Sequence, residues 1–485
     1  MVEQDGLITA TFLVYMIAVL AIGVFAWRRT ANLKDYILGG RRLGSWVTAL
    51  SAQASDMSAW LLMGLPGYAY LAGLEAGWLL LGLLAGTYLN WKYTAARLRA
   101  ATHRYGDSLT LPDYFERRFA DSSGFLRIVS AVFILVFFTF YTSSGLVAGG
   151  KLFEEVFGMP YLAAVASGAG VIVVYTFIGG FLAVSWTDFL QGSMMFLVLV
   201  AVTAFGLVAL GGLDGMSAAM TQTNPELLDM FTKASGEAMT VIGIVSLLGW
   251  GFGYFGQPHI LARFMACRSV DLIPKARRIA MTWQTVALFT GLLAGMIGIG
   301  YLDTPLVGAD SEKVFMVLAK SLFHPVVAGI CLAGILAAVM STADSQLLVA
   351  SSAVAEDFYK GLLRKGASEK ECLWVGRGAV VVIAIIAFFF ALKPDSKVLD
   401  LVAYAWAGFG AAFGPTIFLS LYWQGMSRAG AIAGVIAGGV TVIVWKQLSG
   451  GVFDLYEIVP GVIVSTAAIV IASKLAPPEA PPAEA

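Results

Sequence analysis

Two adjacent hydroxyl residues, Ser341 and Thr342, lie within a long apolar stretch of the sequence. With Ala338 they are spaced by three and four positions, so all three share one face of a helix. The two hydroxyls and a carbonyl freed by a bend would offer three neutral oxygen ligands. Hard cations take such ligands, and unwound carbonyls at helix ends can hold Na⁺ in membranes. The alternative is that both hydroxyls hydrogen-bond to carbonyls of their own helix.

A polar run, Ala52–Ala59, interrupts another apolar stretch. It contains Asp56, and an acid inside a membrane span is costly and suggests a functional site. Serine and aspartate compete for backbone hydrogen bonds, which favours local unwinding of a helix. Carbonyls of an unwound segment from Ala54 to Met57 would complete the cation site. A loop near the membrane surface is the alternative, although apolar residues continue on both sides of the run.

A third interruption spans Gly249–Pro258, which holds four glycines and ends in a proline. Each glycine weakens a helix by about 1 kcal/mol and a proline by about 3 kcal/mol. The sequence therefore predicts a second broken helix in this region.

The composition shows what must surround these residues. Of the 485 residues, 59% are hydrophobic and only 13% are charged, whereas soluble proteins carry about 25% charged residues. The chain is therefore expected to lie in a bilayer. Its 31 basic and 31 acidic residues balance, which excludes the basic face that nucleic-acid binding needs. The three cysteines are far apart and form no disulfide or zinc pattern.

A membrane-crossing helix needs about 20 mostly apolar residues. The sequence contains thirteen such stretches, which predicts an all-α polytopic membrane protein with a single transmembrane domain over residues 1–485. The predicted spans lie near residues 7–27, 46–71, 76–95, 125–149, 162–180, 189–211, 239–256, 279–301, 324–355, 372–392, 399–422, 429–445 and 456–475.

Basic residues set the orientation, because cytoplasmic loops carry an excess of lysine and arginine. With the N-terminus outside and the C-terminus inside, most of the 31 basic residues fall on the inner side. The outer side then keeps only Lys151, Lys233, Lys313, Lys320, Lys393, Lys397 and Lys446. We therefore predict an N-out, C-in topology.

The two broken helices are the second and the seventh predicted spans. Paired interrupted helices in corresponding positions are typical of secondary transporters built from inverted repeats, which bind substrate and ions at the breaks. Their separation fits two five-helix repeats, in spans 2–6 and 7–11. An odd number of spans per repeat makes the two copies run in opposite directions.

Other function classes find little support. The three histidines are isolated, and no HExxH or GxSxG motif occurs, so we expect no enzyme. A channel would suit repeated filter sequences, which are absent.

Several long motifs carry a family resemblance. They are YILGGR at 36–41, WLLMGLPG at 60–67, LTLPDYF at 109–115, AVSWTD at 183–188, GYFGQPH at 253–259, AAVMST at 337–342 and YAWAGFG at 404–410. Through them the chain resembles the sodium/solute symporter family over nearly its whole length, and most closely the bacterial members that carry proline. The resemblance implies a five-plus-five inverted-repeat (LeuT-type) core with one leading and two trailing helices. It also implies sodium-coupled import of L-proline by alternating access.

The same resemblance implies roles for individual residues. One sodium site would be formed by Ala54, Met57, Ala338, Ser341 and Thr342. Asp56 would support sodium binding, and Asp188 would lie on the inner route by which sodium leaves. The proline pocket would involve Ser58, Trp60, Tyr141, Trp250, Tyr254 and Pro258. One departure is visible, because the family's usual Ser-Gly reads Ser58-Ala59 here, and the extra methyl group could tighten the pocket.

Within the family, a symporter for a sugar, pantothenate or another amino acid is the alternative. Sugar sites need many side-chain hydrogen bonds, whereas the candidate pocket offers aromatic faces and few amides. Proton coupling is also open, although neutral oxygens suit a metal ion better. The expected partners are L-proline, Na⁺ as the coupling ion and the lipid bilayer, with no other cofactor, no nucleic acid and no obligate protein partner. The expected location is the inner membrane of a bacterium, crossed many times.

Overall fold

The computed structural model describes residues 2–27, 33–178 and 180–478. The regular secondary structure of this part of the chain is helical, apart from two isolated β-bridges, Leu43 with Cys267 and Thr232 with Ala238. The predicted all-α class is confirmed. Helices suit a bilayer because they satisfy every backbone hydrogen bond within one segment.

The helices include every predicted span and several shorter surface segments. In chain order they are α1 (Val2–Trp27), α2 (Leu33–Leu38), α3 (Ser45–Ala59), α4 (Leu65–Ala72), α5 (Gly77–Leu89), α6 (Ala96–Arg104), α7 (Leu111–Arg118), α8 (Phe125–Phe157), α9 (Tyr161–Ile178), α10 (Phe181–Ala209), α11 (Gly212–Thr223), α12 (Val241–Gly249), α13 (Pro258–Ala266), α14 (Ile273–Tyr301), α15 (Val314–Leu322), α16 (Pro325–Ser352), α17 (Glu369–Phe390), α18 (Val398–Tyr422), α19 (Arg428–Trp445) and α20 (Ile458–Leu475).

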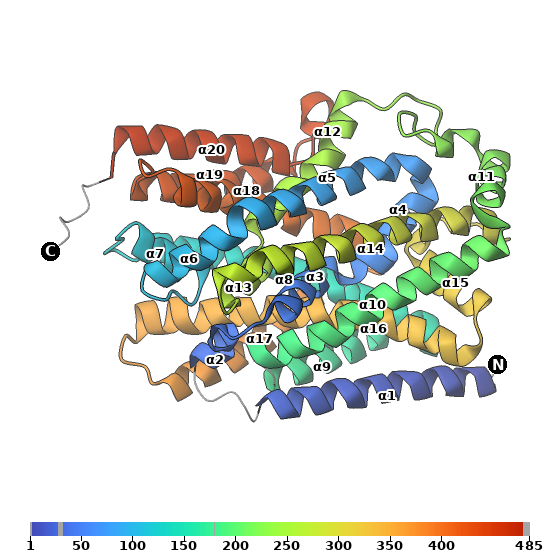
Figure 1. The fold of residues 1–485 in the computed structure, drawn as a ribbon, viewed down its shortest axis with the longest axis horizontal. Helices are drawn as coiled ribbons and strands as arrows, with labels where there is room; N and C mark the ends of the chain where they lie inside the picture. Colours follow the sequence, from blue (N-terminus) through green and yellow to red (C-terminus); the bar gives the residue numbers. More distant parts are fainter. Residues whose placement is uncertain (1, 28–32, 179, 479–485) are drawn as a thin grey trace.

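Ten helical stretches of the described residues are long and apolar enough to cross a membrane. One of them, Ser45–Arg104, covers two predicted spans, while α9 and the stretch Val241–Gly256 are shorter. The long helices lie side by side along the long axis of the bundle, and α1 begins at the opposite end from the one where α20 ends (Figure 1). The count of thirteen spans stays a prediction.

The helix that follows α2 breaks within the predicted run, but at one residue. Ser58, the second-last residue of α3, has φ 34° and ψ −168°, and a π-helical turn over Trp60–Gly64 then leads into α4. A positive φ costs a non-glycine residue about 1–3 kcal/mol, so the surrounding packing must hold Ser58 in place. Ala52–Met57 stays helical, which makes the interruption narrower than the sequence suggested.

The second predicted break is confirmed and is longer. After α12 the chain forms a 3₁₀ segment, Trp250–Gly256, then an extended Gln257, and α13 starts with Pro258 in its first turn. Proline suits this position because its missing N–H would be unpaired there anyway. The glycines allow close packing, since a Cβ on Gly253 would lie 1.8 Å from the indole nitrogen of Trp406.

Helix α16 is at the centre of the bundle. In its stretch Pro325–Leu363, 83% of the most apolar window is buried inside the protein, against 28% for α1. It packs against α3, α8, α10 and α1. The Ser341–Thr342 pair and the broken helix α3 are therefore brought together in the core.

Candidate functional site

The predicted sodium ligands gather where α16 crosses α3. The hydroxyls of Ser341 and Thr342 both point at the carbonyl oxygen of Ala54, at 2.9 Å and 3.3 Å. Ser341 also lies 3.2 Å from the carbonyl oxygen of Ala338 on its own helix. All four residues are buried. The structure thus unites four of the five predicted ligands in a cluster of neutral oxygens.

Met57 and Asp56 lie at the end of α3, next to that cluster. The carbonyl of Met57 is three residues beyond Ala54, and it accepts the backbone N–H of Trp60. Asp56 is fully buried, and neither of its carboxylate oxygens has a hydrogen-bond partner among the described residues. A buried carboxylate without a partner is costly, so this position calls for a cation or a polar ligand nearby.

Asp188 lies in α10, on the side of the cluster away from the break in α3. One of its oxygens accepts the hydroxyl of Ser51 at 2.6 Å and the guanidinium of Arg263 at 3.0 Å. Arg263 also donates to Ser345 at 2.5 Å, and Ser345 donates to the carbonyl of Ser341 at 2.7 Å. Asp188 is thereby connected to the predicted sodium ligands by a chain of buried polar contacts.

Two of the predicted substrate residues meet at the break in α3. The indole nitrogen of Trp60 and the hydroxyl of Tyr141 on α8 both donate to the carbonyl of Asp56, each at 3.3 Å. The hydroxyl of Ser58 accepts the backbone N–H of Trp60 at 3.2 Å. Trp60 and Tyr141 are each only 1% exposed, so the break is surrounded by aromatic faces.

Trp250 and Tyr254 are four positions apart and would project together if their segment were an α-helix. It is a 3₁₀ helix instead, with three residues per turn, so positions four apart lie about 120° apart. Trp250 stacks on Tyr456 with ring centroids 5.4 Å apart, whereas the ring of Tyr254 meets Trp406 edge-on at 4.9 Å. The two rings therefore meet different neighbours, and their joint part in the proline pocket stays a prediction.

The last predicted residue, Pro258, begins α13 and lines a pocket on one side of that helix. The next residue, His259, is buried and packs its ring edge-on to Tyr141 at 5.9 Å. The break before α13 therefore contacts the same aromatic residue as the break in α3.

The sequence reasoning missed two amides. Gln53 on α3 donates to Gln284 on α14 at 2.7 Å, and Gln284 donates to the hydroxyl of Tyr254 at 2.8 Å. All three side chains are buried. This chain ties the two broken helices together through α14. The sequence does carry a signal for these contacts, because both glutamines lie in predicted spans, where polar side chains need partners.

Solved structures of membrane transporters have the same arrangement of helices. A Na⁺-coupled sialic acid symporter in a substrate-bound outward-open state matches with a TM-score of 0.80 at 19% identity, over 98% of this chain and 99% of that chain. A nucleobase-cation-symport-1 family transporter matches with a TM-score of 0.57 at 13% identity, over 91% and 95%. The chain shares the fold of these two proteins.

Sequence comparison is more specific. The profile of the sodium:solute symporter family matches residues 36–438. The sodium/proline symporter of Salmonella typhimurium is 53% identical over 470 residues, covering 96% of this chain and 92% of that protein. The osmoregulated proline transporter OpuE of Bacillus subtilis is 49% identical, covering 95% and 93%. The chain belongs to the sodium:solute symporter family, which confirms the resemblance and makes it a transporter rather than an enzyme.

Proposed function

We propose that the protein imports L-proline together with Na⁺, by alternating access. The observation that carries this proposal is the identity of about half the residues, over nearly the full length, with proteins named sodium/proline symporter. The candidate site adds support, because its oxygen cluster suits Na⁺ and its aromatic residues suit an apolar ring. No specific observation favours a sugar or pantothenate.

The coupling ion would bind at Ala54, Met57, Ala338, Ser341 and Thr342. The approach of both hydroxyls to the Ala54 carbonyl supports this assignment, since Na⁺ can replace the two hydrogen bonds and draw the oxygens around itself. The negative charge of Asp56 would stabilise the ion from the end of α3. Asp188 would serve the ion on its inner route, where the network of Ser51, Arg263 and Ser345 surrounds it.

Proline would bind at the two breaks. Its carboxylate needs hydrogen-bond donors, and the helix that restarts after Ser58 directs the positive end of its dipole at the gap. Its ring needs apolar walls, which Trp60, Tyr141 and Tyr254 would provide, with Trp250 and Pro258 further along the second break. The C–H bonds next to the ammonium are polarised and rest well on aromatic faces.

In the membrane, the chain would form a single domain over residues 1–485, with thirteen spans and a core of two inverted five-helix repeats in spans 2–6 and 7–11. The small number of lysines left on the outer side supports the N-out, C-in orientation. The start of α1 and the end of α20 lie at opposite ends of the bundle, which fits an odd number of spans (Figure 1). The membrane would be the inner membrane of a bacterium, as the bacterial relatives suggest. The transporter would need no nucleic acid and no obligate protein partner.

Uptake of radiolabelled proline into proteoliposomes tests the proposal. An inward sodium gradient should drive accumulation, and an equal potassium gradient should not. Competition by unlabelled proline, compared with glucose and pantothenate, tests the substrate. If proline competes no better than glucose, proline is the wrong substrate, although sodium symport could stand.

A further inference from the structure

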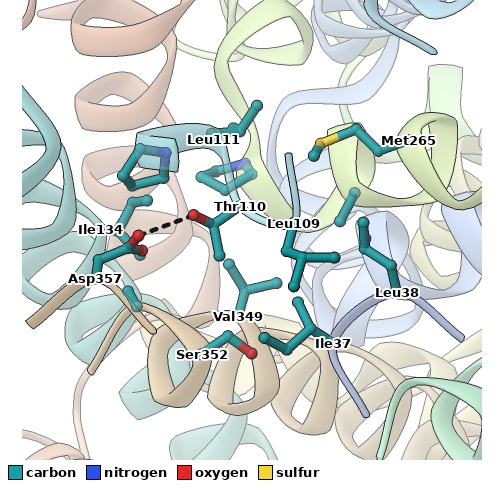
Figure 2. A pocket seen from close by; sticks show the side chains of 14 residues that line it. Ile37, Leu38, Leu109, Thr110, Leu111, Ile134, Met265, Val349, Ser352 and Asp357 are labelled. Carbon is teal, nitrogen blue, oxygen red and sulfur yellow. Dashed lines mark hydrogen bonds between the residues drawn. The ribbon is translucent and has the colours of Figure 1, made fainter. Parts of the chain in front are cut away.

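A pocket opens between α2, α7, α8, α13 and the end of α16, at the end of the bundle away from α11 (Figures 1 and 2). Its walls are mostly apolar. They include Ile37, Leu109, Leu111, Ile134, Met265 and Val349. One acidic side chain, Asp357, also lines it, from the π-helical segment Ala353–Leu363 that continues α16. The enclosed cavity of the pocket is only about 20 Å³, the size of a water molecule, so a small zwitterion fits only when the walls move apart; the one carboxylate would then meet its ammonium group.

The pocket begins at the candidate substrate site. Pro258, Ala262 and Met265 of α13 line one wall at helical spacing, and Pro258 is the residue that follows the second break. The opposite wall is the end of α16, from which Val349 and Ser352 line the pocket. Along the same helix Asp357 lies roughly 20 Å beyond Thr342, at 1.5 Å per residue.

Asp357 is buried and only half satisfied. One carboxylate oxygen accepts the hydroxyl of Thr110 at 3.0 Å, drawn as a dashed line in Figure 2, and the guanidinium of Arg127 at 2.7 Å. The other oxygen has no hydrogen-bond partner among the described residues, although the side chain is 0% exposed. A buried carboxylate oxygen with a free lone pair, in a lined pocket, is a position for a donor from a ligand.

Four carboxylates lie within 4 Å of the Arg127 guanidinium. Besides Asp357, it lies 2.9 Å from Glu116 and 3.8 Å from both Asp113 and Glu356. It can therefore release Asp357 without losing its charge compensation, which would otherwise cost several kcal/mol for a buried ion. The hydroxyl hydrogen of Thr110 can rotate away from Asp357 while its oxygen keeps accepting the backbone N–H of Asp113 at the start of α7.

We propose that this pocket is the inner end of the proline route, and that Asp357 binds the secondary ammonium of proline before it is released. The inference rests on the proposed function. With the route closed, Leu109 and Leu111 fill the pocket, and Thr110 and Arg127 hold Asp357. When proline arrives, its ammonium replaces Arg127 at the carboxylate, and Arg127 stays with Glu116. The segment 109–112 then moves aside.

The first test compares the two faces of the transporter. In right-side-out and inside-out vesicles, Asp357→Asn should raise the half-saturating proline concentration at the inner face about tenfold, the effect of one lost charge-assisted hydrogen bond. The outer face should change by less than about twofold, and Asp357→Glu should recover most of the inner-face affinity. Equal changes at both faces, or no change at either, would overturn the proposal.

The second test does not depend on Asp357. With Cys267, Cys331 and Cys372 replaced by alanine, the Ser352→Cys variant carries one thiol in the pocket wall. A membrane-impermeant maleimide on the inner side should label it about tenfold faster while Na⁺ and proline are cycling, because the pocket opens only then. The attached label should stop transport.

The Leu362→Cys variant is the matched control, since Leu362 lies on the same helical segment, is 52% exposed and does not line the pocket. Its labelling rate should not respond to substrate. If the Ser352→Cys variant is labelled equally with and without substrate and still transports, the pocket is no part of the route. If the parent protein shows no sodium-dependent proline uptake, the proposed function itself fails.

Discussion

Asp56 is a fully buried acid at the break in α3. It lies inside the core, no basic side chain among the described residues pairs with it, and the Tyr254 hydroxyl is the side-chain donor close to its carboxylate. By contrast, Asp188 is paired with Arg263 at 3.0 Å. We therefore propose that Asp56, and not the paired Asp188, supplies the charge that a bound cation needs.

This difference predicts how substitutions of Asp56 behave. Asp56→Asn keeps the size and removes the charge, so sodium-driven proline uptake should fall by about 100-fold or more, as expected when a buried cation loses its counter-charge. Asp56→Glu keeps the charge and shifts its position, so it should retain more activity. Uptake and the half-maximal sodium concentration measure both. If the two variants behave alike and close to the parent, Asp56 is structural only.

Removing either hydroxyl on α16 should change the sodium dependence of uptake more than the proline affinity measured at high sodium. Ser341→Ala or Thr342→Ala should raise the half-maximal sodium concentration about tenfold, since each removes one ligand worth about 1–2 kcal/mol. The apparent proline affinity should fall mainly at low sodium, because the binding of ion and substrate is linked reciprocally. Ser321→Ala is the matched control, since Ser321 is exposed and its hydroxyl bonds to the carbonyl of Val317 on its own helix. Unchanged sodium dependence in both well-folded variants would contradict the site.

Substitutions of the aromatic residues should weaken proline binding and leave sodium binding unchanged. Tyr254→Ala should weaken proline binding about 10- to 100-fold, the equivalent of about 1–3 kcal/mol of lost contact. Trp250→Ala should have an effect in the same range. Phe389→Ala is the control, because Phe389 is 66% exposed. Sodium binding in the absence of proline, measured by calorimetry, should survive all three changes, and its loss would show that the aromatics act through the fold.

At the scale of the helices, the sequence located both interruptions, because a mid-span acid and a cluster of glycines are local signals. It could not give their form. The break at Ser58 is a single strained residue that packing holds in place, and the 3₁₀ segment Trp250–Gly256 depends on close contacts with α5 and α18. The contact between Arg263 and Asp188 was equally beyond reach, since 75 positions separate them and neither carries a local pattern.

Close packing of α5 against the second break leads to a prediction about stability. A Cβ on Gly86 would lie 2.2 Å from the carbonyl oxygen of Gly251, which is backbone and cannot move aside cheaply. Gly86→Ala should therefore destabilise the protein by about 1–3 kcal/mol, the usual cost of overpacking. Gly378→Ala on α17 meets nothing within 4 Å and should be neutral or stabilising by up to about 1 kcal/mol. Thermal unfolding in detergent measures both, and equal stabilities would contradict the proposed contact.

For the whole molecule, the positions of the charges predict an orientation that thiol labelling can check. With the three native cysteines replaced by alanine, the Ser235→Cys variant carries a thiol in the exposed loop before α12, and the Lys365→Cys variant carries one in the exposed loop before α17. In the N-out topology, Ser235 is outside, next to the few outer lysines, and Lys365 is inside, among the many basic residues. The reverse topology would place most lysines and arginines outside, against the rule that cytoplasmic loops carry the excess of basic residues. An impermeant maleimide added to intact cells should therefore label the Ser235→Cys variant and leave the Lys365→Cys variant unlabelled until the membrane is opened. The reverse pattern would mean that the lysine and arginine bias does not set the orientation here, and that the inner end of the proposed proline route faces outward.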